Sequence, residues 1–244
     1  MTSIRLDSIE RAIADIADGR AVVVIDDENR ENEGDIIFAA SKATPELMAF
    51  TIRHSSGVIC VPMPAAMLDR LEIPLMTPHN KDKLRTAYTI SVDARDGVST
   101  GISAADRART ISVAIDAANG TEQIVSPGHV FPLVARHGGV LVRTGHTEAA
   151  VDIARLAGLY PAGVICEVMN DDGTMARLPD LVKFAQLHGL KVGTISDLIA
   201  YRRKHDHFVR RIQEMDFESR NGGQFKLMIY LNSIENQEHV ARDR

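Results

Sequence analysis

The chain has 244 residues, of which 45% are hydrophobic and 25% are charged, with a formal net charge of -5 at pH 7. This size and composition predict one large domain, or a domain with an appendage, that buries a substantial core. The acidic balance argues against nucleic acid as a main partner, and no apolar run is long enough for a membrane span or a leader, so we expect a cytoplasmic protein.

The first elements in chain order are a helix and two strands. Asp7 and Glu10 form a pair typical of a capping box, and isoleucines at helical spacing continue the predicted helix until Gly19. The valine-rich run 21–25 predicts a strand buried on both faces, and the run 36–40 predicts a second one.

Between these two strands lies an acidic segment, Asp26–Asp35, in which six of the ten residues are carboxylates. Like charges packed next to a core repel one another and lose hydration, unless a cation neutralises them. Hard divalent ions such as Mg²⁺ prefer carboxylate and water oxygens. The segment therefore indicates either a metal site or a solvated acidic turn.

A second helix, a turn and a third strand follow. Thr44 is a capping hydroxyl before Pro45, and the helix should continue to about Arg53. The residues 54–57 form a polar turn before the strand 58–61. Cysteines occur at two positions, both within apolar runs, so we expect buried structural thiols in a reducing compartment rather than nucleophiles: Cys60 and Cys166.

Residues 62–85 carry a short helix over 65–71 and then a stretch without period, a connection long enough to form a lid or a binding loop. The alternating segment 86–94 predicts a strand. Ser103 should cap a helix that extends to about Ala118. The hydroxyls and glycine of 98–103 would then lie at a helix N-terminus, where they serve either as caps or as a phosphate site.

Two turns in the next part of the chain carry histidines. The segment 126–129 predicts a tight turn that presents His129, and the strand 130–134 follows it. After the turn 137–139, a strand over 140–143 should end on an arginine, with Thr147 capping a helix that continues to Leu156. One interpretation is an anion site formed by the Arg143 guanidinium, the Thr147 hydroxyl and the amides of the helix N-terminus. The other is a strand-to-helix turn with a solvated arginine.

The strand 162–169 is apolar except for Glu167, and a carboxylate there is costly unless it is paired, functional or on a solvent-facing side. A turn over 170–173, a helix over 179–188 and a strand over 191–195 follow, and Ser196 should cap a last helix through Tyr201. We expect the basic residues of 202–211 to continue this helix. The run 225–231 then predicts a strand, in a hairpin that ends near Glu238–Ala241.

Five stretches together resemble one family, 3,4-dihydroxy-2-butanone 4-phosphate synthase, the riboflavin-pathway enzyme that cleaves ribulose 5-phosphate. The resemblance covers about residues 5–202 in the family's order. The stretches are Asp26–Asp35 (DDENRENEGD), Val98–Arg107 (VSTGISAADR), Ser126–Pro132 (SPGHVFP), Gly138–Ala149 (GGVLVRTGHTEA) and Pro161–Met175 (PAGVICEVMNDDGTM). One such motif would be weak, whereas five in register are specific.

The resemblance implies a metal site and a substrate site. Glu31 would bind two Mg²⁺ ions, with Mn²⁺ as a second option, and His146 would complete the metal site. The residues that would contact ribulose 5-phosphate are Arg30, Glu31, Asp35, Arg143, Thr144, Gly145, His146, Thr147 and Glu167. The family forms homodimers with active sites near the interface, so a homodimer is expected here.

The expected reaction starts with removal of the C3 proton of the ketose, and two metal ions on adjacent oxygens would stabilise the enediolate. Loss of the C1 hydroxyl, a skeletal rearrangement and expulsion of C4 as formate follow. We expect Asp35 or Glu33 to take the first proton, and His129 and Glu167 to serve later steps. Arg143 and Thr147 would hold the phosphate.

We therefore predict an α/β fold, a three-layer domain around a mixed β-sheet, over residues 1–204. Residues 205–244 resemble the opening of GTP cyclohydrolase II, and with only Cys60 and Cys166 in the chain that enzyme's thiolate zinc site cannot form, so no cyclohydrolase activity is expected. Two other functions are compatible with the sequence: a non-catalytic dimerising partner of a complete riboflavin enzyme, and a metal-dependent sugar-phosphate isomerase.

Overall fold

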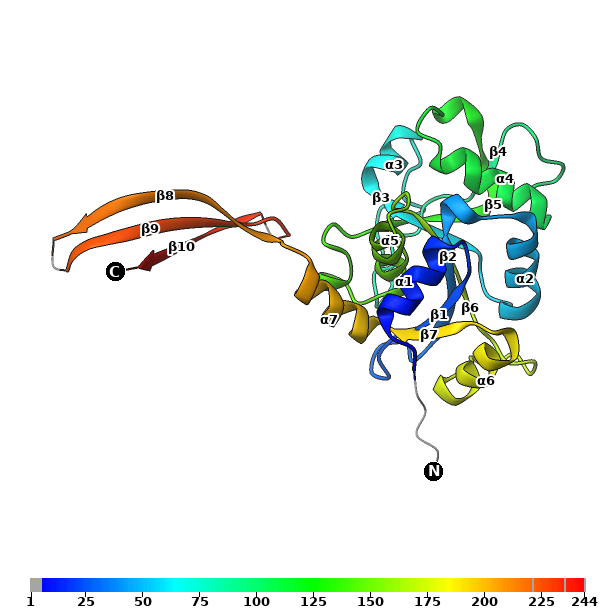
Figure 1. The fold of residues 1–244 in the computed structure, drawn as a ribbon. Helices are drawn as coiled ribbons and strands as arrows, with labels where there is room; N and C mark the ends of the chain where they lie inside the picture. Colours follow the sequence, from blue (N-terminus) through cyan, green and yellow to red (C-terminus); the bar gives the residue numbers. More distant parts are fainter. Residues whose placement is uncertain (1–5, 221, 235, 244) are drawn as a thin grey trace. The chain divides into compact units, whose positions relative to one another are not determined.

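The computed structural model describes residues 6–220, 222–234 and 236–243 (Figure 1). The chain divides into two compact units, Met1–Ala200 and Tyr201–Arg244. Within the described residues, no helix combines the length and the apolar character that a membrane crossing requires.

The described part of the first unit contains a seven-stranded sheet with the order β4-β5-β3-β6-β2-β1-β7. Strands β1 and β7 are parallel, as are β3 and β5, whereas the other neighbours are antiparallel. The predicted mixed sheet is thus confirmed. Its strands are β1 (Val22–Ile25), β2 (Gly34–Ala39), β3 (Cys60–Pro64), β4 (Val92–Ala94), β5 (Ile124–Ala135), β6 (Gly163–Glu167) and β7 (Lys191–Thr194).

Helices cover both faces of this sheet, which confirms the predicted three layers. They are α1 (Ile9–Ala17), α2 (Pro45–Ser55), α3 (Ala65–Arg70), α4 (Ala104–Ile115), α5 (His146–Leu156) and α6 (Leu178–His188), with short 3₁₀ turns at Ala40–Lys42, Thr121–Gln123 and Gly139–Leu141. Helix α7 (Ile195–His205) follows β7 and contains the boundary between the two units.

The alternation of side chains along β6 shows which helices share a face. A Cβ on Gly163 would lie only 2.7 Å from the Cβ of Ala150 in α5. The side chain of Cys166 points the other way, and its sulfur accepts a hydrogen bond from Ser55 of α2 at 2.9 Å. Helix α1 packs against α5, and α4 packs against α2. The sheet therefore lies between an α1/α5 layer and a layer that contains α2 and α4.

The core lies along the central strands. Every residue of β1 and β2 is buried, as expected for strands that are covered on both faces. Two predicted helix starts are also confirmed: the Thr44 hydroxyl accepts from the amide of Leu47, and the Ser103 hydroxyl accepts from the amide of Asp106.

Three other helix starts differ from the prediction. The Asp7 carboxylate accepts from the amide of Val192 instead of capping α1, which begins at Ile9. Helix α5 begins at His146, so Thr147 is a helical residue and not the cap. At α7, which begins one residue before Ser196, the Thr194 hydroxyl accepts from the amide of Asp197.

The predicted strand over 140–143 is wrong. Gly138 and Gly139 have φ values of 89° and 63°, and this left-handed backbone turns the chain into a 3₁₀ turn. Val140 is fully buried and its amide donates to the Asp152 carboxylate at 2.8 Å. The apolar run therefore fills the core beside α5 without pairing as a strand.

Two further segments fold differently from the prediction. The strand expected over 86–94 is regular only in β4, because Tyr88 and Thr89 form single bridges to Leu133 and Leu75. The segment 126–129 is not a turn but part of the long strand β5. A register shift between Val92 and Asp93 accommodates it against β4.

The second unit, in its described part, holds a three-stranded antiparallel sheet of β8 (Val209–Ser219), β9 (Gly223–Asn232) and β10 (Gln237–Asp243). The predicted strand 225–231 lies within β9. Arg210 and Arg211 belong to β8, so the basic helix predicted over 202–211 ends at His205 instead.

Candidate active site

The acidic segment 26–35 forms a loop that is organised around one buried carboxylate. Asp26 accepts hydrogen bonds from the amides of Glu31 and Glu33, at 3.1 and 2.9 Å, and from the Arg30 guanidinium at 2.8 Å. Arg30 also pairs with the Glu31 carboxylate. The loop is therefore a built structure and not a solvated acidic turn, because its charges bind its own backbone.

Two carboxylates from distant parts of the sequence meet across the sheet. Asp35 in β2 and Glu167 in β6 are direct antiparallel partners, so their side chains leave the same face. Glu167 accepts from the amide of Val58 at 2.9 Å, and a Cβ on Gly57 would overlap the Glu167 carboxylate and backbone. The costly position of Glu167 in an apolar strand is thus explained: it faces the same pocket as Asp35.

His146, the first residue of α5, points a ring nitrogen at this carboxylate group. Its Nε2 lies 3.1 Å from the carbonyl oxygen of Val24, which can only accept, so Nε2 carries a proton. Its Nδ1 lies 3.8 Å from Glu31 and 3.7 Å from Asp35. A backbone carbonyl on one ring nitrogen is the usual way in which a metal-binding histidine is oriented.

Burial and mutual repulsion shift the pKa values of these groups. Burial raises the pKa of Asp35 to about 7, although His146 opposes the rise. Burial lowers the pKa of His146, but Asp35, Glu31 and Asp26 outweigh it and bring that pKa to about 9. Burial, followed by the charge of Glu31, raises the pKa of Glu33, whereas the His146 imidazole is the main cause of a lowered pKa at Glu31.

Two guanidinium groups flank the N-terminus of α5. A Cβ on Gly145, the cap residue, would collide with the end of the Arg143 side chain and would lie 2.8 Å from that of Arg30, so a larger residue there would displace the two guanidinium groups. The cap has no side-chain hydrogen bond. Helix N-terminal amides and arginines together are a ready site for an anion such as a phosphate.

Arg143 is held rigidly at this position. Its guanidinium donates to the Glu148 carboxylate at 2.6 Å, to the Thr86 hydroxyl at 2.9 Å and to the carbonyl of Leu84 at 3.2 Å. The solvated arginine that the sequence left open is therefore excluded, because the Arg143 side chain is only 15% exposed.

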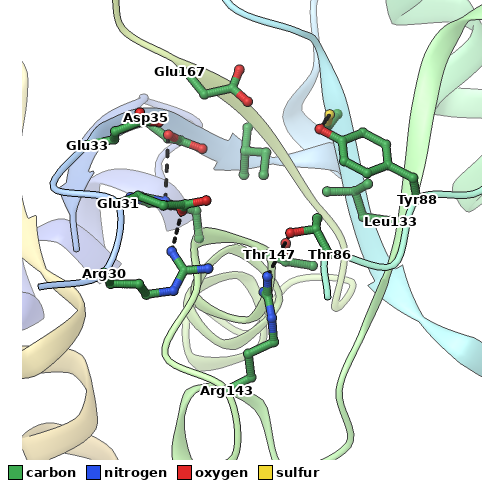
Figure 2. A pocket seen from close by; sticks show the side chains of 13 residues that line it. Arg30, Glu31, Glu33, Asp35, Thr86, Tyr88, Leu133, Arg143, Thr147 and Glu167 are labelled. Atoms are coloured by element: carbon green, nitrogen blue, oxygen red, sulfur yellow. Dashed lines mark hydrogen bonds and ion pairs between the residues drawn. The ribbon is translucent and has the colours of Figure 1, made fainter. Parts of the chain in front are cut away.

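These groups line one pocket (Figure 2). In the figure Arg30 and Arg143 lie at one end, and Glu167 lies at the other. Among the predicted site residues, those that line the pocket are Arg30, Glu31, Glu33, Asp35, Arg143, His146, Thr147 and Glu167. Sequence reasoning did not assign Thr86, Tyr88 and Leu133 to the site, and it treated Cys60, which also lines it, as structural.

The pocket encloses about 60 Å³ and shares Glu31, Thr86 and Tyr88 with a groove of about 790 Å³. Residues 62–85, which include the irregular connection, supply most of the lining of this groove, from Ala65 to Arg85. Both cysteines are buried as predicted, and burial raises the pKa of Cys166 to about 12.

Three predicted site features lie outside the pocket lining. His129 is one of them: its Nδ1 lies 2.7 Å from the Asp93 carboxylate and its side chain is 40% exposed. Thr144 lines a second cavity of about 470 Å³, which shares Arg30 with the pocket. Gly145 acts at the cap of α5 through the space it leaves.

The helix N-terminus at Ser103 is already occupied. The Asp106 carboxylate accepts from the amides of Ser99 and Gly101, at 3.2 and 3.1 Å, and from the Ser99 hydroxyl at 2.7 Å. Of the two possibilities that the sequence left open there, the structure favours internal capping over a phosphate site.

Comparison with known proteins identifies the family. A sequence profile described as 3,4-dihydroxy-2-butanone 4-phosphate synthase matches residues 10–201. The chain belongs to this family. It is 56% identical over 239 residues to "Riboflavin biosynthesis protein RibBA" of Mycobacterium ulcerans (strain Agy99), and 54% identical to the protein of the same name from Mycobacterium tuberculosis (strain ATCC 25618 / H37Rv). These matches cover 97% of the chain but only 56% of each relative.

Solved structures of the family have the same fold. RibBX, described as a two-domain 3,4-dihydroxy-2-butanone 4-phosphate synthase from A. baumannii, superposes with a TM-score of 0.86 at 44% identity, over 98% of this chain and 70% of that one. Another 3,4-dihydroxy-2-butanone 4-phosphate synthase, described in complex with two magnesium ions, superposes with a TM-score of 0.79 at 44% identity, over 82% of this chain and 99% of that one.

The pocket fits a hard divalent cation. Asp26, Glu31 and His146 each offer a ligand atom within 4.8 Å of the others, and Asp35 Oδ1 is buried without a hydrogen-bond partner in the described residues. Asp26 already accepts three hydrogen bonds, so Glu31 and His146 are the better ligands of the three. His146 would give up its Nδ1 proton on binding a metal.

Proposed function

We propose that this chain is a Mg²⁺-dependent carbon-carbon lyase that converts D-ribulose 5-phosphate to L-3,4-dihydroxy-2-butanone 4-phosphate and formate, with Mn²⁺ as a possible substitute. Membership of the family supports this proposal. The observation that carries it is one pocket in which a buried carboxylate, Asp35, lies near His146, and in which two arginines flank the N-terminus of α5.

The phosphate would bind at the N-terminus of α5, between Arg30 and Arg143, with the Thr147 hydroxyl beside it. Because the pocket itself has room for only a few water molecules, the five-carbon chain would extend into the groove beside Tyr88. Glu31 and His146 would hold Mg²⁺, which, when bound, supplies positive charge to stabilise an enediolate.

Of the two predicted bases, Asp35 and Glu33, Asp35 is the better candidate for the first proton transfer. Its Oδ1 lacks a hydrogen-bond partner within the described residues, and burial brings its pKa to about 7, which suits a base at neutral pH. Glu33 also lines the pocket, where its carboxylate would add negative charge, and its amide holds the loop by donating to Asp26. Glu167, across the strands from Asp35, would exchange protons in the later steps.

His129 requires a second copy of the chain in this proposal. It does not line the pocket, yet Asp93 orients its ring and leaves Nε2 free to act as an acid or base. In a homodimer with the active site near the interface, His129 of the other copy would complete the pocket.

The segment 205–244 is proposed to be an incomplete GTP cyclohydrolase II-like portion without its own activity, behind a synthase domain of residues 1–204. GTP supplied to the purified chain should stay intact.

The deciding experiment measures formate from ribulose 5-phosphate with Mg²⁺ and then with a chelator. One formate per substrate, lost on chelation, is the expected result. An isomerase would consume substrate without formate, and a non-catalytic partner would leave the substrate unchanged; either outcome would overturn the proposal.

A further inference from the structure

Arg177 contacts the acidic loop from another part of the chain. After β6, the backbone makes a tight hairpin in which the amide of Ala176 donates to the carbonyl of Val168 at 3.0 Å. Gly173, with φ of 84°, allows the turn, and Asp172 accepts from the amide of Thr174. This hairpin brings the chain back to the sheet and delivers Arg177 at the start of α6.

The Arg177 guanidinium binds backbone and not substrate-facing side chains. Its Nη1 donates to the carbonyl of Glu31 at 2.8 Å and also to the carbonyl of Asn32. Arg177 is half-buried and does not line the pocket. Its own amide donates to the Asp180 carboxylate at 3.3 Å, which ties the arginine to the first turn of α6.

The loop backbone is therefore held from two sides. Asp26 binds the amides of Glu31 and Glu33 from within, and Arg177 binds the carbonyls of Glu31 and Asn32 from the α6 side. Asn32 has φ of 55°, a left-handed conformation that costs free energy in a residue other than glycine. Without outside contacts, this strain and the repulsion among the loop carboxylates would let the loop change conformation.

We propose that Arg177 is a positioning residue for the active site: it fixes the backbone at Glu31 and thereby aims the Glu31 carboxylate at His146. The inference rests on the proposed function and deepens it, because Glu31 is one of the two metal ligands of that proposal. Outer contacts of this kind change metal affinity by about 10- to 100-fold when they are lost.

The test compares R177M, which removes the donors but keeps most of the side-chain volume, with R177K, which keeps a cation. The matched control is R53M, because Arg53 is an exposed arginine of α2. Three quantities are measured on the purified full chain: amide hydrogen exchange over residues 27–33 without metal, the Mn²⁺ dissociation constant, and kcat and KM for formate release.

In R177M we expect loop exchange to be about tenfold faster, the Mn²⁺ dissociation constant to rise by about tenfold, and kcat to recover partly at high metal concentration. R177K should fall between R177M and the wild type, and R53M should match the wild type. Unchanged loop exchange and metal affinity in a folded R177M would overturn the inference.

Failure of the proposed function gives a different pattern. If the wild type releases no formate, the exchange and Mn²⁺ measurements still test Arg177, because neither depends on turnover. If R177M does not fold, R177K takes its place, and wild-type loop exchange together with wild-type Mn²⁺ affinity in R177K would also contradict a positioning role.

Discussion

The pocket around Asp35 and the pair formed by His129 and Asp93 differ in how many charged groups they bring together and in how deeply these are buried. In the pocket, the carboxylates and His146 are crowded and largely buried, and the pKa values of Asp35 and His146 move far from their usual range. His129 instead has one carboxylate partner and remains 40% exposed. Within one chain the pocket thus gathers groups that could hold ions, whereas His129 is oriented by Asp93 and lies outside the pocket lining.

The largest expected effect is in the pocket. Replacing Glu31 or His146 by alanine removes a proposed metal ligand, so formate release should fall below detection, at least 10³-fold. Retained activity in either variant would exclude the metal assignment. The control is R53M, whose formate release should equal that of the wild type.

The second prediction distinguishes the role of His129 in catalysis from the role of the pocket in metal binding. H129A should lower kcat by about 10²- to 10⁴-fold, the range for loss of an acid-base group, while Mn²⁺ affinity stays unchanged. A mixture of H129A and H146A chains that exchange subunits should regain activity, because one of the two sites in a mixed dimer is then intact. If the mixture stays inactive although mixed dimers form, His129 does not act from the second copy.

The third prediction concerns the two arginines. G145A would force Arg30 and Arg143 apart, so KM for ribulose 5-phosphate should rise by about tenfold or more with only a small change in Tm. Steady-state kinetics with and without added inorganic phosphate would measure this change in KM. Phosphate should inhibit the wild type more strongly than G145A. Equal KM and phosphate inhibition in both proteins would place the anion site elsewhere.

The smallest expected effect is on stability. The pKa of Asp35 is about 7 in the fold against a usual value of 3.8, so its ionisation destabilises the metal-free protein. This cost is at its full value above pH 7, decreases as the pH falls from 7 toward 3.8, and is absent below 3.8. D35N should therefore have a higher Tm than the wild type at pH 8 in the presence of a chelator, by about 2–4 °C for each kcal/mol of stability regained. Lowering the pH from 8 to 6 should raise the Tm of D35N less than that of the wild type.

Added Mg²⁺ should affect the stability of the wild type and of D35N differently. It should stabilise the wild type more than D35N, because the ion offsets the charge that D35N lacks. A lower Tm for D35N at pH 8 would show that the Asp35 charge is already compensated in the metal-free protein.

The sequence allowed much of the fold to be predicted, because the relevant signals were local. Buried strands such as β1 and β2 are continuous apolar runs, and the caps at Thr44 and Ser103 depend on residues three positions apart. The failures arose where distant contacts decide the structure. The run 140–143 resembles a strand, but the backbone of Gly138 and Gly139 and the contact with Asp152 make it a turn.

The candidate site was predictable in its parts but not in its organisation. The motifs pointed to Glu31, Asp35, His146 and Glu167, and all four line one pocket. The role of Asp26 in binding the loop amides, and that of Arg177, 146 residues away from Glu31, depend on chain folding that no local pattern encodes. His129 was expected with these residues, yet the structure places it outside their pocket.

The pairing of β2 with β6 determines where the sequence can accept inserted or deleted residues. Asp35 and Glu167 share the pocket face only because the two strands are aligned opposite each other, while the side chains next to them, Ile36 and Cys166, point to the α2 side. A single inserted or deleted residue in either strand would exchange the two faces, burying a carboxylate in the core and turning an apolar side chain into the pocket. Insertions are therefore tolerable in the loops that lead to these strands, but within the strands they would remove the site and the fold together.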